Sequence, residues 1–306
     1  MRRLVAVGTA VVVLAMGSQA SSFGTINGLG QNHEHEQITR TALKDAGFGP
    51  HTLSDLAGGR GTFGAVGAPD QPLRGLLSLK AAHCDGGDYL DVPGYPQSKS
   101  KAQKALESCR SFIFSHLTEA VNAAGGLLDK DGHVKPRDAA ADGNCTFNGV
   151  KGRAKCNVLE NLGLAFHASQ DFYSHTNWMD DAAPGAIGPT NPRGLGNTDI
   201  SYWLNPRYNQ AFPAGLISGC YEGVPESRNC KYGDGKVRVR HEALNKDTAS
   251  SPRGLINNNY AKAMAMAAAD TKDKWAYFTK HLTDKYGDAR ARKMVCLITH
   301  DDYKTC

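Results

Sequence analysis

Apolar side chains recur every three or four residues in four segments of the chain. The segments are residues 34–46, 98–125, 157–178 and 257–286. This spacing places the apolar side chains on one face of an α-helix and so predicts four helices. Between them, residues 126–156 and 180–256 are rich in Gly, Pro and Asn, and only the VRVRH stretch at 237–241 alternates like a short strand. We expect a mainly α protein with long loops.

The N-terminus departs from this pattern. Arg2 and Arg3 precede an apolar run from Leu4 to Gly17, which is followed by SQASS. This order is typical of a secretory signal peptide, and the run is too short to span a bilayer. We expect cleavage after Ala20, or as late as after residue 22, and a secreted mature chain whose residues 21–306 form a single domain.

Composition and charge narrow the class of protein. The chain has 306 residues, of which 41% are hydrophobic and 21% charged, as in a globular protein with a sizeable core. Loss of Arg2 and Arg3 with the signal peptide lowers the formal net charge from +5 to +3. This charge says little about partners. The short basic stretch KVRVRH favours a solvated strand or loop over a nucleic-acid groove.

The cysteines indicate how the loops are held. All eight lie in the mature region, and an even number in an exported chain favours disulfides. We expect neighbours to pair because this closes short loops, although the sequence alone leaves other connectivities open. The expected pairs are 84–109, 145–156, 220–230 and 296–306. No CxxC spacing supports a cysteine-ligated zinc, so His, Asp and Glu remain the candidate metal ligands.

Three candidate ligands share one predicted helix, in LGLAFHASQDFYSHTNW at 162–178. His167, Asp171 and His175 are four residues apart and fall within an arc of about 80° on a helix. They are either polar core residues or metal ligands. A carboxylate buried between two imidazoles costs several kcal/mol unless it is paired or metal-bound.

Further candidate ligands lie outside this helix. They are His35 in NHEHEQIT, Asp70 in GAPDQP, His83 in AAHCDGGDY, and His241 with Glu242 and Asp247 in HEALNKD. Asp70 could instead be a turn residue and His83 a surface histidine. Taken together, imidazole and carboxylate groups from several helices are the ligands that zinc takes at hydrolytic sites.

These motifs resemble a known family. The motif order is similar to that of the zinc-dependent phospholipase C and P1-type nuclease superfamily. It consists of an early His-x-x-Ile, an Asp with a His thirteen residues later, the H-x3-D segment with a further His, and a late His with acidic neighbours. SSFG, HEQIT, HASQDFYSHTNW and HEALNKD look closest to its HET-C-related branch of secreted actinobacterial proteins of CinY type. The resemblance implies an all-helical phospholipase C/P1 nuclease-like fold and two or three zinc ions.

The resemblance also implies a ligand assignment. One zinc would be held by Asp70, His83, His167 and Asp171. Asp171 would also bind a second zinc and so bridge the two ions. The other ligands of this second zinc would be His35 and the amino group and carbonyl of the mature N-terminal residue. His175 and His241 would hold a third with an acid. Asp70 would serve as the catalytic base or the carboxylate that orients water.

Two departures from the family concern the ligands. Phospholipase C and P1 nuclease begin their mature chains with Trp, whereas Phe23 or Ser21 would begin this one. Their late pair is His-x3-Glu or His-x3-Asp, whereas the fourth residue after His241 is Asn245. Asp247 is the acid we expect beside His175 and His241. It points about 240° away from His241 on a helix, so it can ligate only if HEALNKD is not regular helix.

The resemblance favours a secreted zinc-dependent phosphodiesterase of phospholipase C type. Its substrate would be a phosphate ester, such as a phospholipid head group, and contact with a membrane surface fits such a substrate. Nothing in the sequence indicates an obligate protein partner. One alternative is a P1-type nuclease, which is disfavoured because the chain has three Trp and only a diffuse charge. Another is a non-catalytic HET-C-like protein that binds zinc and acts on a membrane or a partner.

Overall fold

The protein is mainly helical, as the hydrophobic pattern predicts. The computed structural model describes residues 23–25, 27–28, 31–59, 62–141, 143, 145–223 and 226–306. The expected signal peptide lies outside these described residues. Within them, no helix is both long and apolar enough to cross a membrane.

The four predicted helices form. They are α1 (Glu34–Leu43), α4 (Lys99–Ala124), α6 (Ala154–His175) and α9 (Asn259–Tyr286). The hydroxyl of Ser98 accepts a hydrogen bond from the Lys101 amide and caps the start of α4. The start of α9 is two residues later than expected because Asn257 and Asn258 have left-handed backbones, with φ of 45° and 60°.

Two further helices of substantial length are not predicted by the pattern. They are α2 (Pro50–Ala57) and α10 (Asp288–Thr299). α10 buries Ala291, Met294 and Leu297, which have helical spacing, but it begins only one residue after α9 ends, and charged residues fill its first turns. The shorter helices are α3 (Lys80–His83), α5 (Pro136–Ala139), α7 (Glu226–Asn229) and α8 (Pro252–Leu255).

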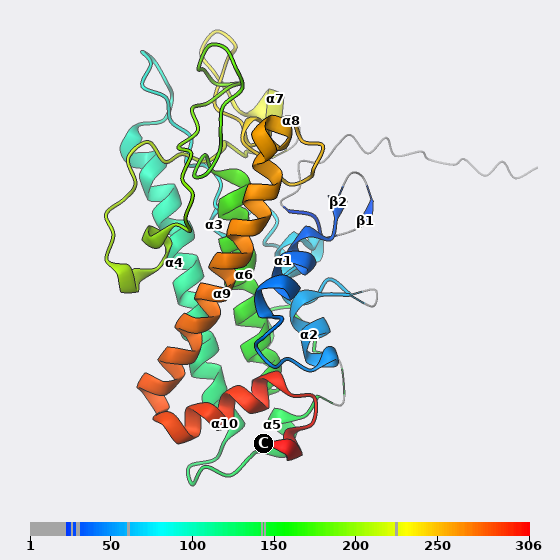
Figure 1. Cartoon of the computed structure of the whole chain (residues 1–306). Helices are drawn as coiled ribbons and strands as arrows, with labels where there is room; N and C mark the ends of the chain where they lie inside the picture. The colour runs from blue at the N-terminus through cyan, green and yellow to red at the C-terminus, as the bar shows by residue number, and fades with distance from the viewer. Residues whose placement is uncertain are drawn as a thin grey trace, which may run out of the picture.

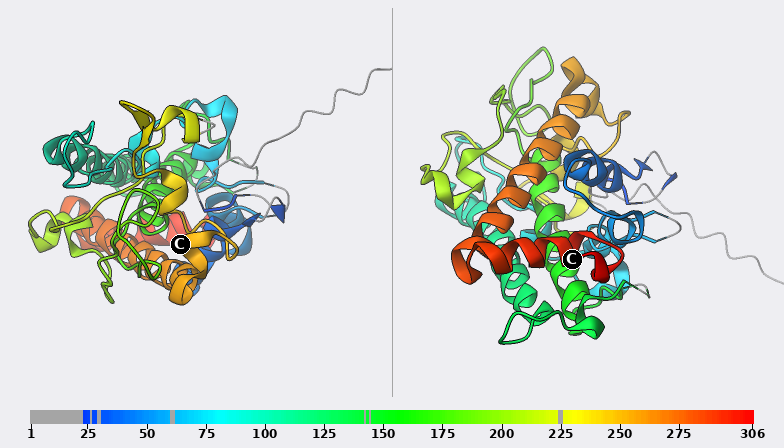
Figure 2. Two further views of the ribbon diagram at one scale, coloured as in Figure 1. Left: turned by 90° about the horizontal axis from the view of Figure 1, so that it is seen from above. Right: turned by 60° about the horizontal axis from the view of Figure 1, so that its bottom comes forward.

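α6 is the central helix of the fold. Twenty of its twenty-two residues are buried, and it packs mainly against α4 and α9. Figure 1 shows α6 between these two long helices, with α1 and α2 beside it and α10 crossing near one end. The second panel of Figure 2, seen from that end, shows α10 lying across the ends of the longer helices. A helix that is apolar on nearly all sides is buried in this way.

The long loops contain little β-structure. Among the described residues the strands form two antiparallel pairs, β1 (Asn27–Gly28) with β2 (Gln31–Asn32) and β3 (Lys231–Tyr232) with β4 (Lys236–Val237). The expected strand at 237–241 is present only at Val237. The rest of that stretch runs beside Cys220, which forms a parallel bridge with Arg240.

Disulfides hold these loops as predicted. The bonds join Cys84 to Cys109, Cys145 to Cys156, Cys220 to Cys230 and Cys296 to Cys306. The first connects α3 to α4, and the third closes the loop that precedes His241. The expected neighbour pairing is therefore confirmed at all four positions.

Candidate metal centre

All eight predicted ligands lie in two adjacent groups along α6. The Asp171 group consists of His35, Asp70, His83, His167 and Asp171. The His175 group consists of His175, His241 and Asp247, together with Asp85 and Glu226, which the sequence analysis did not select. All ten side chains are buried except that of Asp70, which is slightly exposed.

Asp171 lies at the centre of the first group. Its Oδ1 is 3.3 Å from His35 Nε2, and its Oδ2 is 3.0 Å from His83 Nδ1 and 3.1 Å from His167 Nε2. The two carboxylate oxygens therefore face different histidines. A carboxylate placed in this way can bridge two metal ions.

Asp70 closes the same group from a surface loop. Its Oδ1 is 3.7 Å from His167 Nε2 and 3.8 Å from His83 Nδ1, and its Oδ2 is 4.0 Å from His35 Nε2. The loop can lie this close to α6 because of Gly163, where a Cβ would be only 2.4 Å from the backbone carbon of Ala65. The backbone approach at Gly163 therefore places Asp70 over the helix.

Backbone and amide oxygens orient the imidazole rings. His35 Nδ1 is 2.7 Å from Gln170 Oε1, His167 Nδ1 is 2.8 Å from the Val66 carbonyl, and His175 Nδ1 is 2.7 Å from the His83 carbonyl. Each of these oxygens can accept a hydrogen bond from a protonated Nδ1. In a neutral ring Nε2 then carries the lone pair that a metal needs, and it faces a carboxylate of its group. Metal-ligating histidines usually donate a hydrogen bond from the other ring nitrogen to an oxygen in this way.

The His175 group continues from the C-terminal end of α6. His175 Nε2 is 3.2 Å from Asp247 Oδ1, and His241 Nε2 is 3.9 Å from Asp247 Oδ2. HEALNKD is not a regular helix, since only His241–Ala243 forms a 3-10 turn. The condition for Asp247 to reach both histidines is therefore met. Glu242, the other acid of this stretch, is exposed and pairs with Arg240.

Asp85 and Glu226 are the site residues that the sequence analysis missed. Asp85 Oδ1 is 3.4 Å from His175 Nδ1, and Glu226 Oε1 is 3.2 Å from His241 Nδ1. Asp85, His175 and His241 each offer a ligand atom within 4.8 Å of the other two. Asp85 follows Cys84, whose left-handed backbone ends α3. The position of Asp85 next to His83 and Cys84 was the one available signal in the sequence, whereas no such signal marks Glu226, the first residue of the short helix α7.

A buried ion-pair network fixes the loop that carries Asp247. Lys246 Nζ donates hydrogen bonds to the carbonyl of Thr176 and to Asp180, which also accepts from Arg253. The Lys246 amide donates to the Ser174 hydroxyl, which in turn donates to Asp247 Oδ1. The end of α6 therefore determines where Asp247 lies.

The carboxylates change the protonation of the histidines. Burial opposes protonation of His35 and His83, but the charges of Asp171 and Asp70 outweigh it and raise the pKa of both. At His175 burial again opposes protonation, but the charges of Asp85, Asp171 and Asp247 outweigh it and raise the pKa of this imidazole well above its usual value. For His167 burial prevails and lowers the pKa. The nearby His167 and His175 keep the pKa of Asp171 well below its usual range despite its burial.

These residues fit a metal centre. Oδ1 of Asp85, Oδ1 of Asp171 and Oδ2 of Asp247 are buried and accept no hydrogen bond of good geometry among the described residues, although each lies within 4 Å of a histidine nitrogen. Buried carboxylate oxygens of this kind are costly unless a cation compensates them. The nitrogen and oxygen donors suit zinc and other divalent transition metals. Several metal ions could thus be held along α6.

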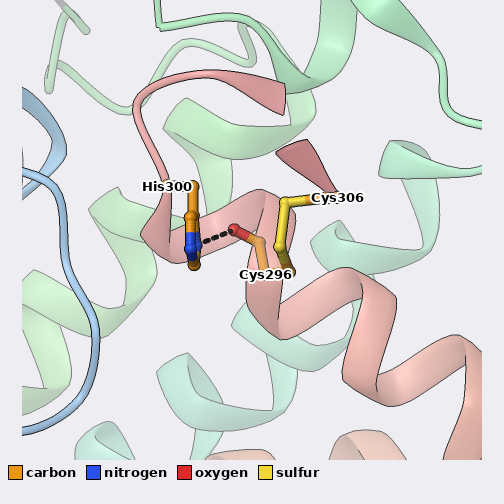
Figure 3. A group of neighbouring side chains, drawn as sticks. All are labelled: Cys296, His300 and Cys306. Atoms are coloured by element: carbon orange, nitrogen blue, oxygen red, sulfur yellow. Dashed lines mark hydrogen bonds between the residues drawn. A yellow bond between two sulfur atoms is a disulfide. The ribbon is translucent and has the colours of Figure 1, made fainter. Parts of the chain in front are cut away.

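Two other clusters of potential ligands have simpler explanations. Cys296 and Cys306 are joined by a disulfide, and the adjacent His300 Nδ1 lies 3.1 Å from the carbonyl of Cys296, as Figure 3 shows. Their sulfurs are therefore not available as thiolates. Asp129, Asp131 and His133 form a largely exposed turn, where Asp129 Oδ1 accepts hydrogen bonds from the other two backbone amides.

Comparisons with known proteins do not place the chain in a family. No protein-family model, no curated protein and no solved structure matches it. The case for a function therefore depends on the geometry of the two groups and on the motifs that form them.

Proposed function

We propose that this protein is a secreted zinc-dependent phosphodiesterase of phospholipase C type. The observation that carries the proposal is the position of Asp171, whose two oxygens face His35 on one side and His83 and His167 on the other. A bridging carboxylate with histidines on both sides is a feature of multinuclear hydrolytic centres. The ordered ligand motifs, which resemble those of the phospholipase C and P1 nuclease superfamily, support the same function.

The start of the mature chain supports this assignment. If cleavage follows residue 22, Phe23 becomes the N-terminal residue. Its ring is buried with its centre 5.9 Å from that of His35, and the Gly24 carbonyl accepts a hydrogen bond from the His35 amide. The first mature residues would therefore lie beside the ligand that the family pairs with its N-terminus. Cleavage after residue 22 is the site we propose.

The chain's own residues divide the catalytic work. Zinc held by the two groups would supply Lewis-acid stabilisation of the phosphoryl oxygen and would lower the pKa of water to near neutrality. Asp70 lies at the more open edge of the Asp171 group and is suited to orient the attacking water or accept its proton. Gln170 and the Val66 carbonyl hold the imidazoles in one orientation, which limits reorganisation during the reaction.

The His175 group bears on the non-catalytic alternative. A HET-C-like protein without turnover would be favoured if Asn245, in place of the family's acid, left His175 and His241 without a carboxylate. Asp85, Glu226 and Asp247 all lie beside His175 or His241, so the departure from the family spacing does not deprive these histidines of acids. This geometry favours a catalytic protein.

Metal analysis and turnover test the proposal together. We expect two or three zinc ions per mature chain and hydrolysis of a phosphocholine ester faster than of single-stranded DNA. Asp171→Asn is expected to lower turnover by at least about 100-fold, because it removes a ligand shared by both sides of the centre.

Asp270→Asn provides the matched control. Asp270 is also fully buried, but it pairs with Lys274 on α9 and accepts a hydrogen bond from Ser169, and it belongs to neither ligand group. The Asp270→Asn substitution should destabilise the protein without changing its zinc content. Purified protein that holds no zinc, or turnover that is equal in Asp171→Asn and the unchanged protein, would refute the proposed function.

A further inference from the structure

A pocket of about 500 Å³ is lined by residues between positions 72 and 80 and by residues 221–223. Its wall is formed by two segments that adjoin residues of the two groups. The lining residues are Pro72, Gly75, Leu77, Ser78, Lys80, Tyr221, Glu222 and Gly223. The first segment follows Asp70 and leads into His83, and the second leads towards Glu226.

Two contacts join the segments that form this pocket to the two groups, and the second of them is made by Tyr221, which lines the pocket. The Leu76 carbonyl lies 3.3 Å from His83 Nε2, and the ring of Tyr221 is centred 5.7 Å from that of His241. Burial, followed by the charges of Asp85, Glu226 and Asp70, raises the pKa of Tyr221. A molecule in the pocket would therefore lie next to the candidate metal centre.

An exposed ion pair crosses the pocket. Lys80 Nζ is 2.6 Å from Glu222 Oε1, and the two side chains are 41% and 38% exposed. Pairs this exposed contribute little to stability, so a ligand can displace one partner at small cost. Lys80 is also the only cation among the described residues that line the pocket.

Glu222 would keep a cationic partner if Lys80 moved away. Arg238 Nη1 is 3.5 Å from the same Oε1 atom, and Arg238 is itself fixed by two hydrogen bonds to the buried Asp88. The aliphatic stem of Lys80 lies over Gly86, where a Cβ would be 3.0 Å from Lys80 Cδ. Lys80 can thus change its partner while its stem stays in place.

We propose that this pocket binds the phosphate anion of a substrate or product, and that Lys80 transfers from Glu222 to the phosphate when the ligand enters. The carboxylates of the two groups would offset much of the charge of any bound metal, so an anion benefits from a further cation at this position. The inference rests on the proposed function for the choice of a phosphate ester. Glu222 acts as the competitor for Lys80 and weakens anion binding.

The proposal gives substitutions with opposite signs. We expect Lys80→Met to weaken the binding of inorganic phosphate and of dimethyl phosphate by roughly three- to tenfold. Glu222→Gln is expected to strengthen both by roughly two- to fivefold, because it frees Lys80. In the double variant with Lys80→Met and Glu222→Gln, this gain in phosphate affinity should vanish. Calorimetric titration of the full mature protein measures each affinity.

Lys130→Met is the matched control, because Lys130 is an exposed lysine paired with Asp131 outside the pocket. It should leave both affinities unchanged. Unchanged phosphate binding in Lys80→Met, weaker binding in Glu222→Gln, or an equal loss in Lys130→Met would overturn the proposal. Failure of both inorganic phosphate and dimethyl phosphate to bind would overturn it as well.

Turnover separates this inference from the proposed function. If no phosphodiester is hydrolysed but phosphate affinity follows the predicted signs, the proposed function fails and the binding site stands. If phosphodiesters are hydrolysed but Lys80→Met leaves KM and phosphate affinity unchanged, the binding site fails and the proposed function stands.

Discussion

The Asp171 group and the His175 group use the same residue types but are supported differently. In the Asp171 group, His35, His167 and Asp171 stand on α1 and α6, two helices that the hydrophobic pattern predicts. In the His175 group only His175 belongs to a helix of that length, and its partners come from loops or short turns. Helical spacing fixes neighbours by itself, whereas the loop ligands depend on a disulfide and a buried ion-pair network. We therefore expect the His175 group to lose its metal more readily when distant contacts are removed.

Replacing one histidine in each group should give the largest contrast. His167 contributes to two sets of three ligands, with His35 and Asp70 and with His83 and Asp171, whereas His241 contributes to one set, with Asp85 and His175. His167→Gln is expected to cost more of the bound metal than His241→Gln, and to lower kcat/KM by at least about 100-fold. Metal analysis after dialysis and steady-state kinetics measure both effects.

His116→Gln is the control for these variants, because His116 is a partly buried histidine whose Nδ1 lies 2.8 Å from Asn161 outside both groups. It should retain the full metal content. A greater metal loss in His241→Gln than in His167→Gln would contradict the inference that His167 serves two ligand sets and His241 only one.

Two disulfides of equal span distinguish loop support from general stability. Cys220–Cys230 and Cys296–Cys306 each have a sequence separation of 10, so replacing either pair by serine should cost about 2–3 kcal/mol of unfolding free energy. Only the first holds the site, because the Cys220 carbonyl accepts a hydrogen bond from the His241 amide. Removing Cys220–Cys230 should weaken metal binding by roughly 10- to 100-fold.

Denaturant unfolding and metal titration of the two serine variants make the comparison. The Cys296–Cys306 variant should keep its metal affinity despite its lower stability. If both variants lost metal equally, the disulfide at 220–230 would have no particular role in placing His241.

Two buried lysines test how much the positioning of a ligand loop contributes to metal binding, which is the smallest of these effects. Lys246 and Lys274 are both fully buried and both pair with an aspartate, Asp180 or Asp270. Only Lys246 directly precedes a candidate ligand, Asp247, and its Nζ holds that loop to the end of α6 by donating a hydrogen bond to the Thr176 carbonyl. Either lysine replaced by Met should cost on the order of 3 kcal/mol of stability, but only Lys246→Met should weaken metal binding, by about tenfold.

The cobalt-substituted protein gives the measurement for this pair. Its visible spectrum should change in Lys246→Met and should be the same in Lys274→Met as in the unchanged protein. Equal spectra in all three proteins would show that Asp247 keeps its position without Lys246.

The sequence was most informative where structure is periodic. The spacing of His167, Asp171 and His175 on α6 follows from helix geometry, and short loop closure was enough to predict all four disulfides. It was least informative where contacts join distant segments. Glu226 approaches His241 across a disulfide-closed loop, and Asp85 reaches His175 because Cys84 has a left-handed backbone. No periodicity connects these positions.

By itself the sequence determined the helices α1, α4, α6 and α9, the cysteine pairing and the one-sided row of ligands on α6, because each depends on spacing along the chain. The tertiary structure alone decided which acids join His175 and His241. That choice depends on close backbone approaches, such as Gly219 against His241, where a Cβ would lie 2.2 Å from the His241 Cα. It also depends on Lys246, which holds the following residue against the end of α6. Such contacts arise from packing between segments, and residue spacing does not encode them.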